Sequence, residues 1–269
     1  VGRPVNFKVE KSAPKTGRPV LEVKNLSVMN AKKLLGVKNF SLTVHAGEIV
    51  GLAGVDGNGQ TELVEAICGL VPAESGSVII GGTDATNLTV RKRNELGLGH
   101  IPEDRIKRGL IASLRIAENM VVKSYYRKPF SGNGILNFPE INSYSEEIVR
   151  KFDVRSGEGI NSPAGKLSGG NQQKMIVGRE ISMNPELLIA VQPTRGLDVG
   201  AIEYIHSQIV AHRDKGNAVL LVSLELDEIF NLSDRIAVIS GGELMNIVDT
   251  ASTDEHSVGL MMAGVRDKK

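Results

Sequence analysis

Residues 54–61 read Gly-Val-Asp-Gly-Asn-Gly-Gln-Thr, the spacing of a phosphate-binding loop with a glutamine where a lysine normally stands. An apolar run at 49–53 precedes this phosphate loop and an apolar-periodic segment at 61–67 follows it. Strand, glycine loop and helix N-terminus therefore come in the required order. The amides can still cradle phosphate oxygens, whereas Gln60 lacks the positive charge that reaches the β- and γ-phosphates. The residues expected to contact nucleotide are Gly54, Gly57, Asn58, Gly59, Gln60 and Thr61.

Size and composition exclude several classes of protein. With 269 residues the chain can bury a substantial core, and 32 basic against 31 acidic residues give a net charge of +1, which argues against nucleic acid as a partner. No apolar run approaches the roughly 18 residues that span a bilayer. Cys68 is single and lies in an apolar run, so we expect a buried thiol and no disulfide. The first residue, Val1, is neither an initiator methionine nor part of an apolar signal, so we expect the chain to be cut from a longer protein or processed.

The first two thirds of the chain divide by pattern. Residues 1–19 are basic and contain proline, which is typical of an interdomain linker, and we expect one domain over 20–269. Alternating apolar residues at 21–26 and 40–44 predict antiparallel strands, and a hairpin-like stretch at 75–82 continues that layer. Residues 104–165, which are polar and in places rich in glycine and serine, predict a mostly helical insert, with helices at 116–122 and 143–152.

In the last third, short buried strands alternate with helices, which favours a parallel sheet. The expected strands are 187–191, 218–223 and 235–240, and the expected helices are 200–215 and 225–232. His206 and His212 lie on the first of these helices without the spacing of metal ligands, so we expect them on its solvated face.

A second motif lies at residues 167–172, here called the signature segment. Its members are Leu167, Ser168, Gly169, Gly170, Asn171 and Gln172, and an apolar-periodic run follows at 175–181. A serine and two glycines at a helix N-terminus present amides and a hydroxyl to an anion. An ordinary serine cap with a glycine turn is the alternative interpretation.

Over residues 20–265 the chain resembles the ATP-binding domains of ABC transporters. The resemblance rests on three segments in this order: the phosphate loop, the signature segment and the run at 192–198. The resemblance implies an α/β fold: a mixed core sheet with a phosphate loop, an antiparallel β layer and a helical subdomain at about 104–185. It implies ATP and Mg²⁺ as cofactors and assigns 196–198, with Asp198, to the D-loop. In that family two domains pair head to tail, and each signature segment closes over the γ-phosphate held in the partner's loop.

Several positions depart from the family pattern. Val191 and Gln192 stand where a metal-binding aspartate and a catalytic glutamate are expected, Leu224 replaces the switch histidine, and Glu103 replaces the glutamine that reaches the metal. Loss of a general base costs about 10²–10⁴ in rate. Loss of the lysine removes a contact worth roughly 1.5–3 kcal/mol, and a valine offers Mg²⁺ no oxygen. We therefore expect no metal site and no ATP turnover here, with Mg²⁺ held mainly at the partner's site.

The resemblance can be narrowed to the second ATPase domain of fused tandem subunits, which serve simple-sugar and nucleoside importers. Three segments support this: the run at 191–201, the signature segment and the sequence Pro-Glu-Asp-Arg at 102–105. Gln192 before Pro193 favours the nucleoside branch. The implied partners are the first ATPase domain of the same subunit, two transmembrane permease subunits and, indirectly, an extracytoplasmic solute-binding protein, at the cytoplasmic face of the membrane. The permeases are expected to dock beside Glu103 and the helical insert.

The resulting hypothesis is a degenerate domain that donates its signature segment and Asp198 to a competent partner and couples ATP use to solute uptake. A regulatory pseudo-ATPase that binds nucleotide without serving transport is the alternative. An ABC-type protein acting on ribosomes or DNA would need a strongly basic arm or long heptads, and neither is present. A lone phosphate-loop kinase has no use for the signature segment.

Overall fold

The computed structural model describes residue 9 and residues 11–265, which form two compact units. The first unit takes in the described residues up to His100, together with Pro185–Gln192 and the described residues from His206 onward. The second unit comprises Ile101–Asn184 and Pro193–Ile205.

A six-stranded sheet forms the centre of the first unit, in the order β12-β11-β3-β10-β9-β6. The strands are β3 (Ile49–Ala53), β6 (Leu98–Ile101), β9 (Leu187–Val191), β10 (Ala218–Val222), β11 (Arg235–Ser240) and β12 (Glu243–Asp249). Strands β11, β3, β10 and β9 are parallel, and β12 runs antiparallel to β11. Every residue of β3, β9 and β10 is buried, which is why continuous apolar runs correctly predicted parallel strands.

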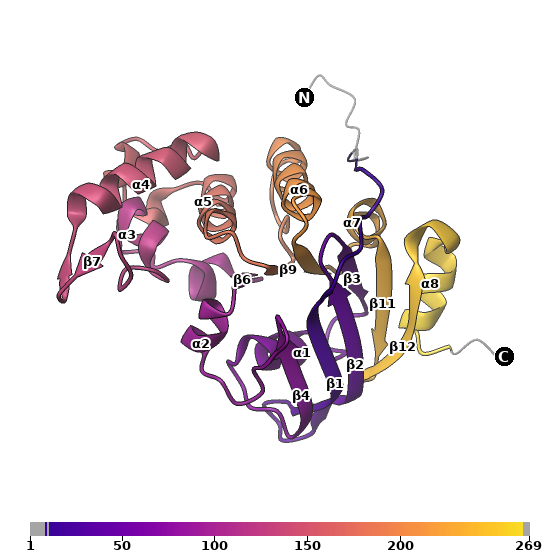
Figure 1. Cartoon of the computed structure of the whole chain (residues 1–269). Coiled ribbons are helices and arrows are strands. Elements are labelled where there is room, and N and C mark those ends of the chain that lie inside the picture. Colours follow the sequence, from indigo (N-terminus) through magenta and orange to yellow (C-terminus); the bar gives the residue numbers. More distant parts are fainter. Residues whose placement is uncertain (1–8, 10, 266–269) are drawn as a thin grey trace. The chain divides into compact units, whose positions relative to one another are not determined.

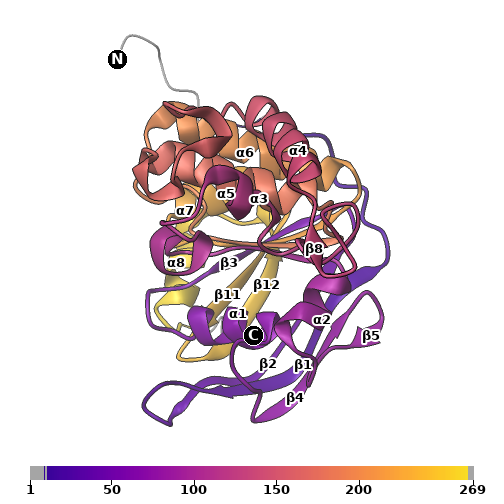
Figure 2. The same cartoon turned by 90° about the vertical axis from the view of Figure 1, so that its left-hand side faces the viewer.

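A second, antiparallel sheet has the order β2-β1-β4-β5 and can be followed at the lower edge of Figure 2. Its strands are β1 (Pro19–Met29), β2 (Leu35–His45), β4 (Ser75–Ile80) and β5 (Thr83–Asp84). The predicted pairing is confirmed, with Leu21 opposite Val44 on one side and Ile80 on the other. The main core joins apolar side chains of β1, β2 and β4 to those of the parallel strands and of helix α1 (Gln60–Cys68), and Cys68 is buried there as expected.

The remaining helices of the first unit are short. They are α2 (Val90–Glu95), α7 (Leu226–Leu232) and α8 (Glu255–Met262); α6 (Val199–Asp214) begins in the second unit and continues into the first. Among the described residues, no helix combines the length and the apolar character needed to cross a membrane.

The second unit is mainly helical, and its helices α3 (Ile116–Val121), α4 (Phe138–Lys151) and α5 (Gly169–Ser182) are labelled in Figure 1. The second unit also contains a π-helix (Arg105–Gly109), 3-10 turns at Gly159–Asn161 and Ala164–Lys166, and a hairpin of β7 (Ser131–Gly132) and β8 (Ile135–Leu136). One more 3-10 turn, Thr250–Ser252, belongs to the first unit. The two predicted helices of the insert are confirmed. Helix α4 begins before the predicted 143 because the Asn137 side chain accepts a hydrogen bond from the Glu140 amide and caps the helix there.

The prediction that His206 and His212 lie on a solvated face of α6 is wrong. Both are buried, with 4% and 1% of their surface exposed. The Nε2 atom of His206 lies 2.8 Å from Oε1 of Glu228 on α7. Along α6 the buried positions 201, 205, 206, 209, 210, 212 and 213 fall within one half of the helix circumference, so both histidines lie on the same broad buried face as the apolar residues.

Part of the predicted linker lies against the first unit. Residues 1–8 and 10 are outside the described residues, whereas the Lys11 ammonium donates to the carbonyls of Leu232 and Ser233 at 3.1 and 2.5 Å. The amide of Gly17 donates to the carbonyl of Ala46 at 2.8 Å, just before β1 begins. A connecting role for this segment stays a prediction.

Candidate functional site

The candidate nucleotide site of the first unit lies where its parallel strands end. The phosphate loop follows β3, Gln192 follows β9, and Leu224 lies two residues beyond β10. Because these strands are parallel and adjacent, their carboxyl ends meet at one edge of the sheet. The fold therefore brings together three of the predicted segments, whereas Glu103, the signature segment and Asp198 belong to the second unit.

The phosphate loop has the backbone of an anion cradle. Gly57 and Gly59 have φ values of 82° and 104°, in the left-handed region that glycine adopts without strain. A side chain at Gly59 would also collide with the carbonyl oxygen of Gly36, 2.4 Å from its Cβ position. Gly59, the N-cap of α1, has no side chain and therefore makes no capping hydrogen bond to the amides of the first turn. These residues fit a phosphate group.

Gln60 fills the position of the missing lysine with a neutral group. Its side chain is buried, and its Nε2 donates to the carbonyl of Val55 at 3.1 Å, within the same loop. The amide packs so closely on Gly54 that a Cβ there would lie 2.6 Å from Nε2. The glutamine thus closes the loop on itself and provides an amide dipole in place of a cation.

Asn58 ties the phosphate loop to the turn between β11 and β12. Its Oδ1 accepts from the Gly241 amide at 2.5 Å, and its carbonyl accepts from the Gly242 amide at 3.0 Å. Its Nδ2 donates to the Val55 carbonyl at 2.9 Å. The loop is therefore held in place by its own chain.

The metal-binding and basic groups of a hydrolytic site are absent from the strand ends of the described part of the chain. Val191 is 9% exposed, and Gln192 is 8% exposed with a φ of 48°. A glutamine cannot accept a proton from water at neutral pH, and a valine cannot bind a cation. Leu224 is an exposed apolar side chain with no titrating group. Within residues 9 and 11–265, no three His, Cys, Asp or Glu side chains are grouped to hold a metal ion. The expectation that the chain's own site binds no Mg²⁺ stays a prediction.

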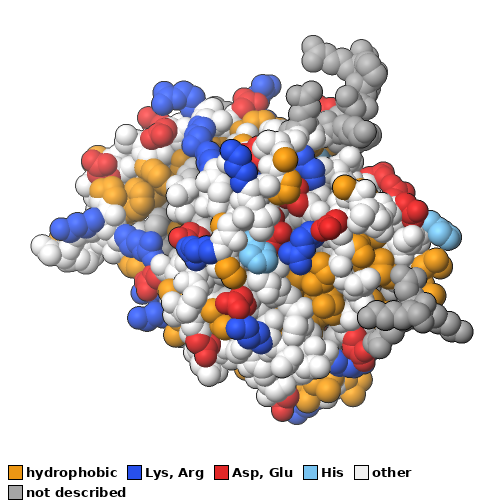
Figure 3. Space-filling model, turned by 45° about the vertical axis from the view of Figure 1, so that its right-hand side comes forward, with side chains coloured by type: hydrophobic (Ala, Val, Ile, Leu, Met, Phe, Trp, Pro, Cys, Tyr) orange, Lys and Arg blue, Asp and Glu red, His pale blue; other side chains and the backbone are white. Residues whose placement is uncertain are grey.

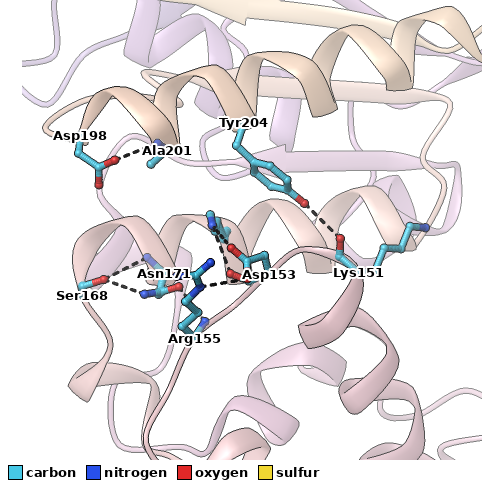
Figure 4. A network of polar contacts seen from close by, with 9 residues as sticks. Lys151, Asp153, Arg155, Ser168, Asn171, Asp198, Ala201 and Tyr204 are labelled. Atoms are coloured by element: carbon cyan, nitrogen blue, oxygen red, sulfur yellow. Dashed lines mark hydrogen bonds and ion pairs between the residues drawn. The ribbon is translucent and has the colours of Figure 1, made fainter. Parts of the chain in front are cut away.

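The signature segment forms the N-terminus of α5, a helix of 14 residues. Ser168 is exposed, and its Oγ accepts from the backbone amide and the side-chain Nδ2 of Asn171 at 3.4 and 2.9 Å (Figure 4). The Oδ1 of Asn171 in turn accepts from the Arg155 amide at 2.8 Å. Leu167 and Gln172 are buried and anchor the segment. An exposed, rigid helix N-terminus with a hydroxyl is suited to binding an anion.

Asp198 lies beside this helix N-terminus within the second unit. Its Oδ1 accepts from the Ala201 amide at 3.0 Å (Figure 4), and its Oδ2 lies 3.5 Å from the Cβ position of Gly170. The Nε2 of Gln173 donates to the Pro193 carbonyl at 2.7 Å, which joins α5 to the segment that leads to Asp198. The structure thus brings the signature segment and Asp198 together.

Glu103 is engaged in an ion pair with Arg195, in the second unit. The Nη1 of Arg105 donates to the Arg195 carbonyl at 2.9 Å. Sequence reasoning assigned Glu103 a metal-reaching position and gave Arg195 and Arg105 no role. Both arginines stand inside the quoted motifs, but no spacing rule indicated that they contact each other.

Acidic and basic side chains are interspersed on the face of the molecule drawn in Figure 3. No large area of a single sign appears there among the described residues, in keeping with the net charge of +1. Binding to a nucleic acid backbone requires such an area. The expectation that nucleic acid is not a partner remains a prediction.

Comparison with known sequences identifies relatives over nearly the whole chain. Residues 37–195 match the family described as ABC transporter. The chain is 51% identical to the nucleoside import ATP-binding protein NupA of Lactococcus lactis subsp. cremoris, over 98% of this chain and 52% of that protein. It is 50% identical to the guanosine import ATP-binding protein NupO of Bacillus subtilis, over 100% and 52%. The glucose import ATP-binding protein of Haloferax volcanii is 41% identical, over 99% and 49%. The chain spans about half the length of these curated relatives.

Comparison with solved structures confirms the predicted fold class. A nucleotide-free ATP-binding cassette from an ABC transporter aligns with a TM-score of 0.74 at 19% identity, covering 91% of this chain and 95% of that one. A dimeric cassette in a post-hydrolysis state with ADP and Pi aligns with a TM-score of 0.71 at 23% identity, covering 86% and 98%. At these identities the likeness extends to the fold alone.

Proposed function

The chain belongs to the ABC transporter family, and we propose that it is a catalytically degenerate ATP-binding domain that completes the competent site of a partner ATPase domain. The solute imported by the assembled transporter is a nucleoside, with a simple sugar as the less favoured alternative. Two relatives that are 50–51% identical to this chain support this choice, because they are a nucleoside import protein and a guanosine import protein.

The observation that carries the proposal is the contrast between the two halves of the nucleotide chemistry. On one side, Gln60 replaces the lysine, Val191 the metal ligand and Gln192 the base, while Leu224 replaces the switch histidine. On the other side, Ser168 caps an exposed helix N-terminus, as a group donated to a partner must. A domain with an intact donated half and a defective accepting half is useful in an asymmetric pair.

Bound ATP, with Mg²⁺ at the partner's site, supplies the phosphoryl group whose hydrolysis drives the transport cycle. Gly57, Gly59 and the first-turn amides of α1 would hold phosphates in the chain's own loop. Ser168, Gly169 and Gly170 would face the terminal phosphate in the partner's loop. We further propose the first ATPase domain of the same subunit as that partner, two permeases and a solute-binding protein as the other components, and the cytoplasmic face of the membrane as the location.

The test is a Ser168→Arg substitution in the full-length subunit assembled with its permeases. We expect ATP hydrolysis to fall by roughly 100-fold or more, because a long cation at this site prevents closure over the phosphate and removes donors that stabilise transferred charge. Ser257→Arg, at an exposed serine in the first turn of α8, is the matched control and should keep its activity. Unchanged hydrolysis by the Ser168 variant would falsify the donor role.

A regulatory ATP-binding protein outside transport is the competing proposal, and assembly distinguishes the two. Affinity purification of the full-length subunit from membranes should recover permease subunits in stoichiometric amount. Their absence would favour the regulatory alternative.

A further inference from the structure

Arg105 is held in a fixed position relative to the signature helix. It is the first residue of the π-helix Arg105–Gly109, a rare form that occurs often at functional sites. Asp104 caps this turn by accepting from the amides of Ile106 and Lys107 at 3.0 and 2.9 Å. These bonds, that to Lys107 above all, hold the pKa of the Asp104 carboxyl below its usual range.

The far end of the π-helix is seated directly on α5. A Cβ at Gly109 would lie 2.6 Å from Cδ1 of Ile176, so the backbone of the turn packs directly on this side chain of α5. A larger residue at 109 would require Ile176 to move. The turn is therefore in packing contact with the signature helix within the second unit.

The guanidinium of Arg105 extends from this turn across the signature segment. Its Nη1 donates to the Arg195 carbonyl at 2.9 Å, and its Nη2 lies 3.5 Å from the Cβ position of Gly169. Arginine has five donors in a planar fork, so one arm can anchor the group while the other faces a ligand. The anchoring bond fixes the charge beside the first glycine of α5.

The charges around the helix N-terminus are unequal. The carboxylate of Glu103 is paired with Arg195, which reduces its opposition to the charge of Arg105. The carboxylate of Asp198 borders the next glycine, Gly170. An anion at this surface is thus favoured near Gly169 and disfavoured near Asp198.

We propose that Arg105 is a further phosphate-contacting residue of the signature surface, one that favours nucleotides with a terminal γ-phosphate. The proposal rests on the proposed function, because the phosphate belongs to the nucleotide in the partner's loop. The helix N-terminus of α5 supplies about half a positive charge, and the guanidinium adds a full charge with directional donors. The terminal phosphate is the part of the nucleotide that a donated signature segment faces, so ATP gains from Arg105 and ADP does not.

The experiment compares Arg105→Gln with Lys107→Gln in the full-length subunit assembled with its permeases. Both substitutions remove one positive charge from the same turn, but Lys107 is highly exposed, and the turn needs only its backbone amide. ATP hydrolysis is measured against ATP concentration, and ADP is added as a competitive inhibitor. We expect Arg105→Gln to raise the KM for ATP roughly 10- to 100-fold, the effect of one charged hydrogen bond. The inhibition constant for ADP should change by less than about twofold, and Lys107→Gln should match the wild type.

The outcomes separate the possible explanations. Equal losses of ATP and ADP affinity, or equal behaviour of the two variants, would refute the role of Arg105 in reading the γ-phosphate. If Arg105→Gln does not assemble, Arg105→Lys keeps the charge without the fork, and an unchanged ratio of ATP to ADP affinity in it would also refute the role. ATP hydrolysis by the Ser168→Arg variant is measured in parallel. Full activity of that variant would contradict the proposed function. If that variant is inactive but Arg105→Gln has the same KM for ATP as the wild type, only the role of Arg105 is contradicted.

Discussion

Arg93 on α2 fixes the far end of the helix that carries the phosphate loop. Its side chain is 3% exposed, and its guanidinium donates to four backbone carbonyls. Nη1 donates to Ala66 and Ile67 at 2.5 and 2.7 Å, Nη2 to Thr86 at 2.8 Å, and Nε to Leu88 at 3.0 Å. The first two carbonyls belong to the last turn of α1, where the helix leaves acceptors unsatisfied and a cation is favoured.

The substitution Arg93→Met keeps most of the aliphatic volume and removes all four donors. Burial lowers the pKa of Arg93 and therefore disfavours its charge, and hydrogen bonds to the four carbonyls replace the water that the guanidinium has lost. Without the guanidinium, the carbonyls of Ala66 and Ile67 lose their charged donor in a buried site, and an unsatisfied buried acceptor costs about 1–3 kcal/mol. A typical domain is stable by about 5–15 kcal/mol, so this loss is a large fraction of the total.

The assay is urea unfolding, combined with hydrogen exchange of the α1 amides from Leu63 to Cys68. Lys92→Met is the matched control, since Lys92 is exposed on the same helix and its substitution should change the free energy of unfolding by no more than about 0.5 kcal/mol. We expect a lower urea midpoint and faster α1 exchange for the Arg93 variant only. A difference of less than about 0.5 kcal/mol between the two variants would show that the carbonyls do not depend on Arg93.

Two further predictions concern acid stability and the phosphate loop. Burial lowers the pKa of His212 from 6.5 to about 4, so between these values the unfolded chain takes up a proton that the folded chain does not. The free energy of unfolding should therefore fall by up to about 3 kcal/mol as the pH falls from 6.5 toward 4. In urea titrations His212→Asn should reduce this dependence of the free energy of unfolding on pH, whereas His256→Asn, at an exposed histidine, should leave it unchanged. Gln60→Lys should raise the affinity of the loop for ATP by roughly 10- to 100-fold without adding phosphate release, because Val191 offers no metal ligand and Gln192 no base. New release above that of the wild-type subunit in a coupled phosphate assay would contradict that reasoning.

Local pattern was sufficient for the strands and for the loops that follow them. The run 187–191 matches β9 at both ends, because a fully buried strand is apolar throughout. The run 235–240 matches β11, whose four central residues are buried and apolar while its ends, Arg235 and Ser240, are half-buried. The phosphate loop could be recognised because its backbone needs glycines at fixed spacing, and Gly57 and Gly59 indeed have positive φ. Interpretation of 167–172 as a capped helix N-terminus succeeded for the same reason.

Contacts between residues far apart in sequence could not be predicted from those patterns. His206 and His212 lie within the single buried face of α6, so helical periodicity itself indicated burial, and the lack of metal-ligand spacing did not imply exposure. What the sequence could not show is the partner of His206, the Glu228 carboxylate on α7. Arg93 likewise resembles any basic residue of a short polar helix, yet it donates to carbonyls up to 27 residues away.

The sequence by itself determined the family, the buried parallel strands of the last third and the phosphate loop, since these depend on residue type and local spacing. Only the tertiary structure decided which groups work together. It closed Gln60 onto Val55 within the loop, paired Glu103 with Arg195, and placed the guanidinium of Arg105 beside Gly169. The physical reason is that a contact such as that between Arg105 and Gly169 depends on how segments far apart in the sequence pack together, and that distance is a property of the folded chain as a whole.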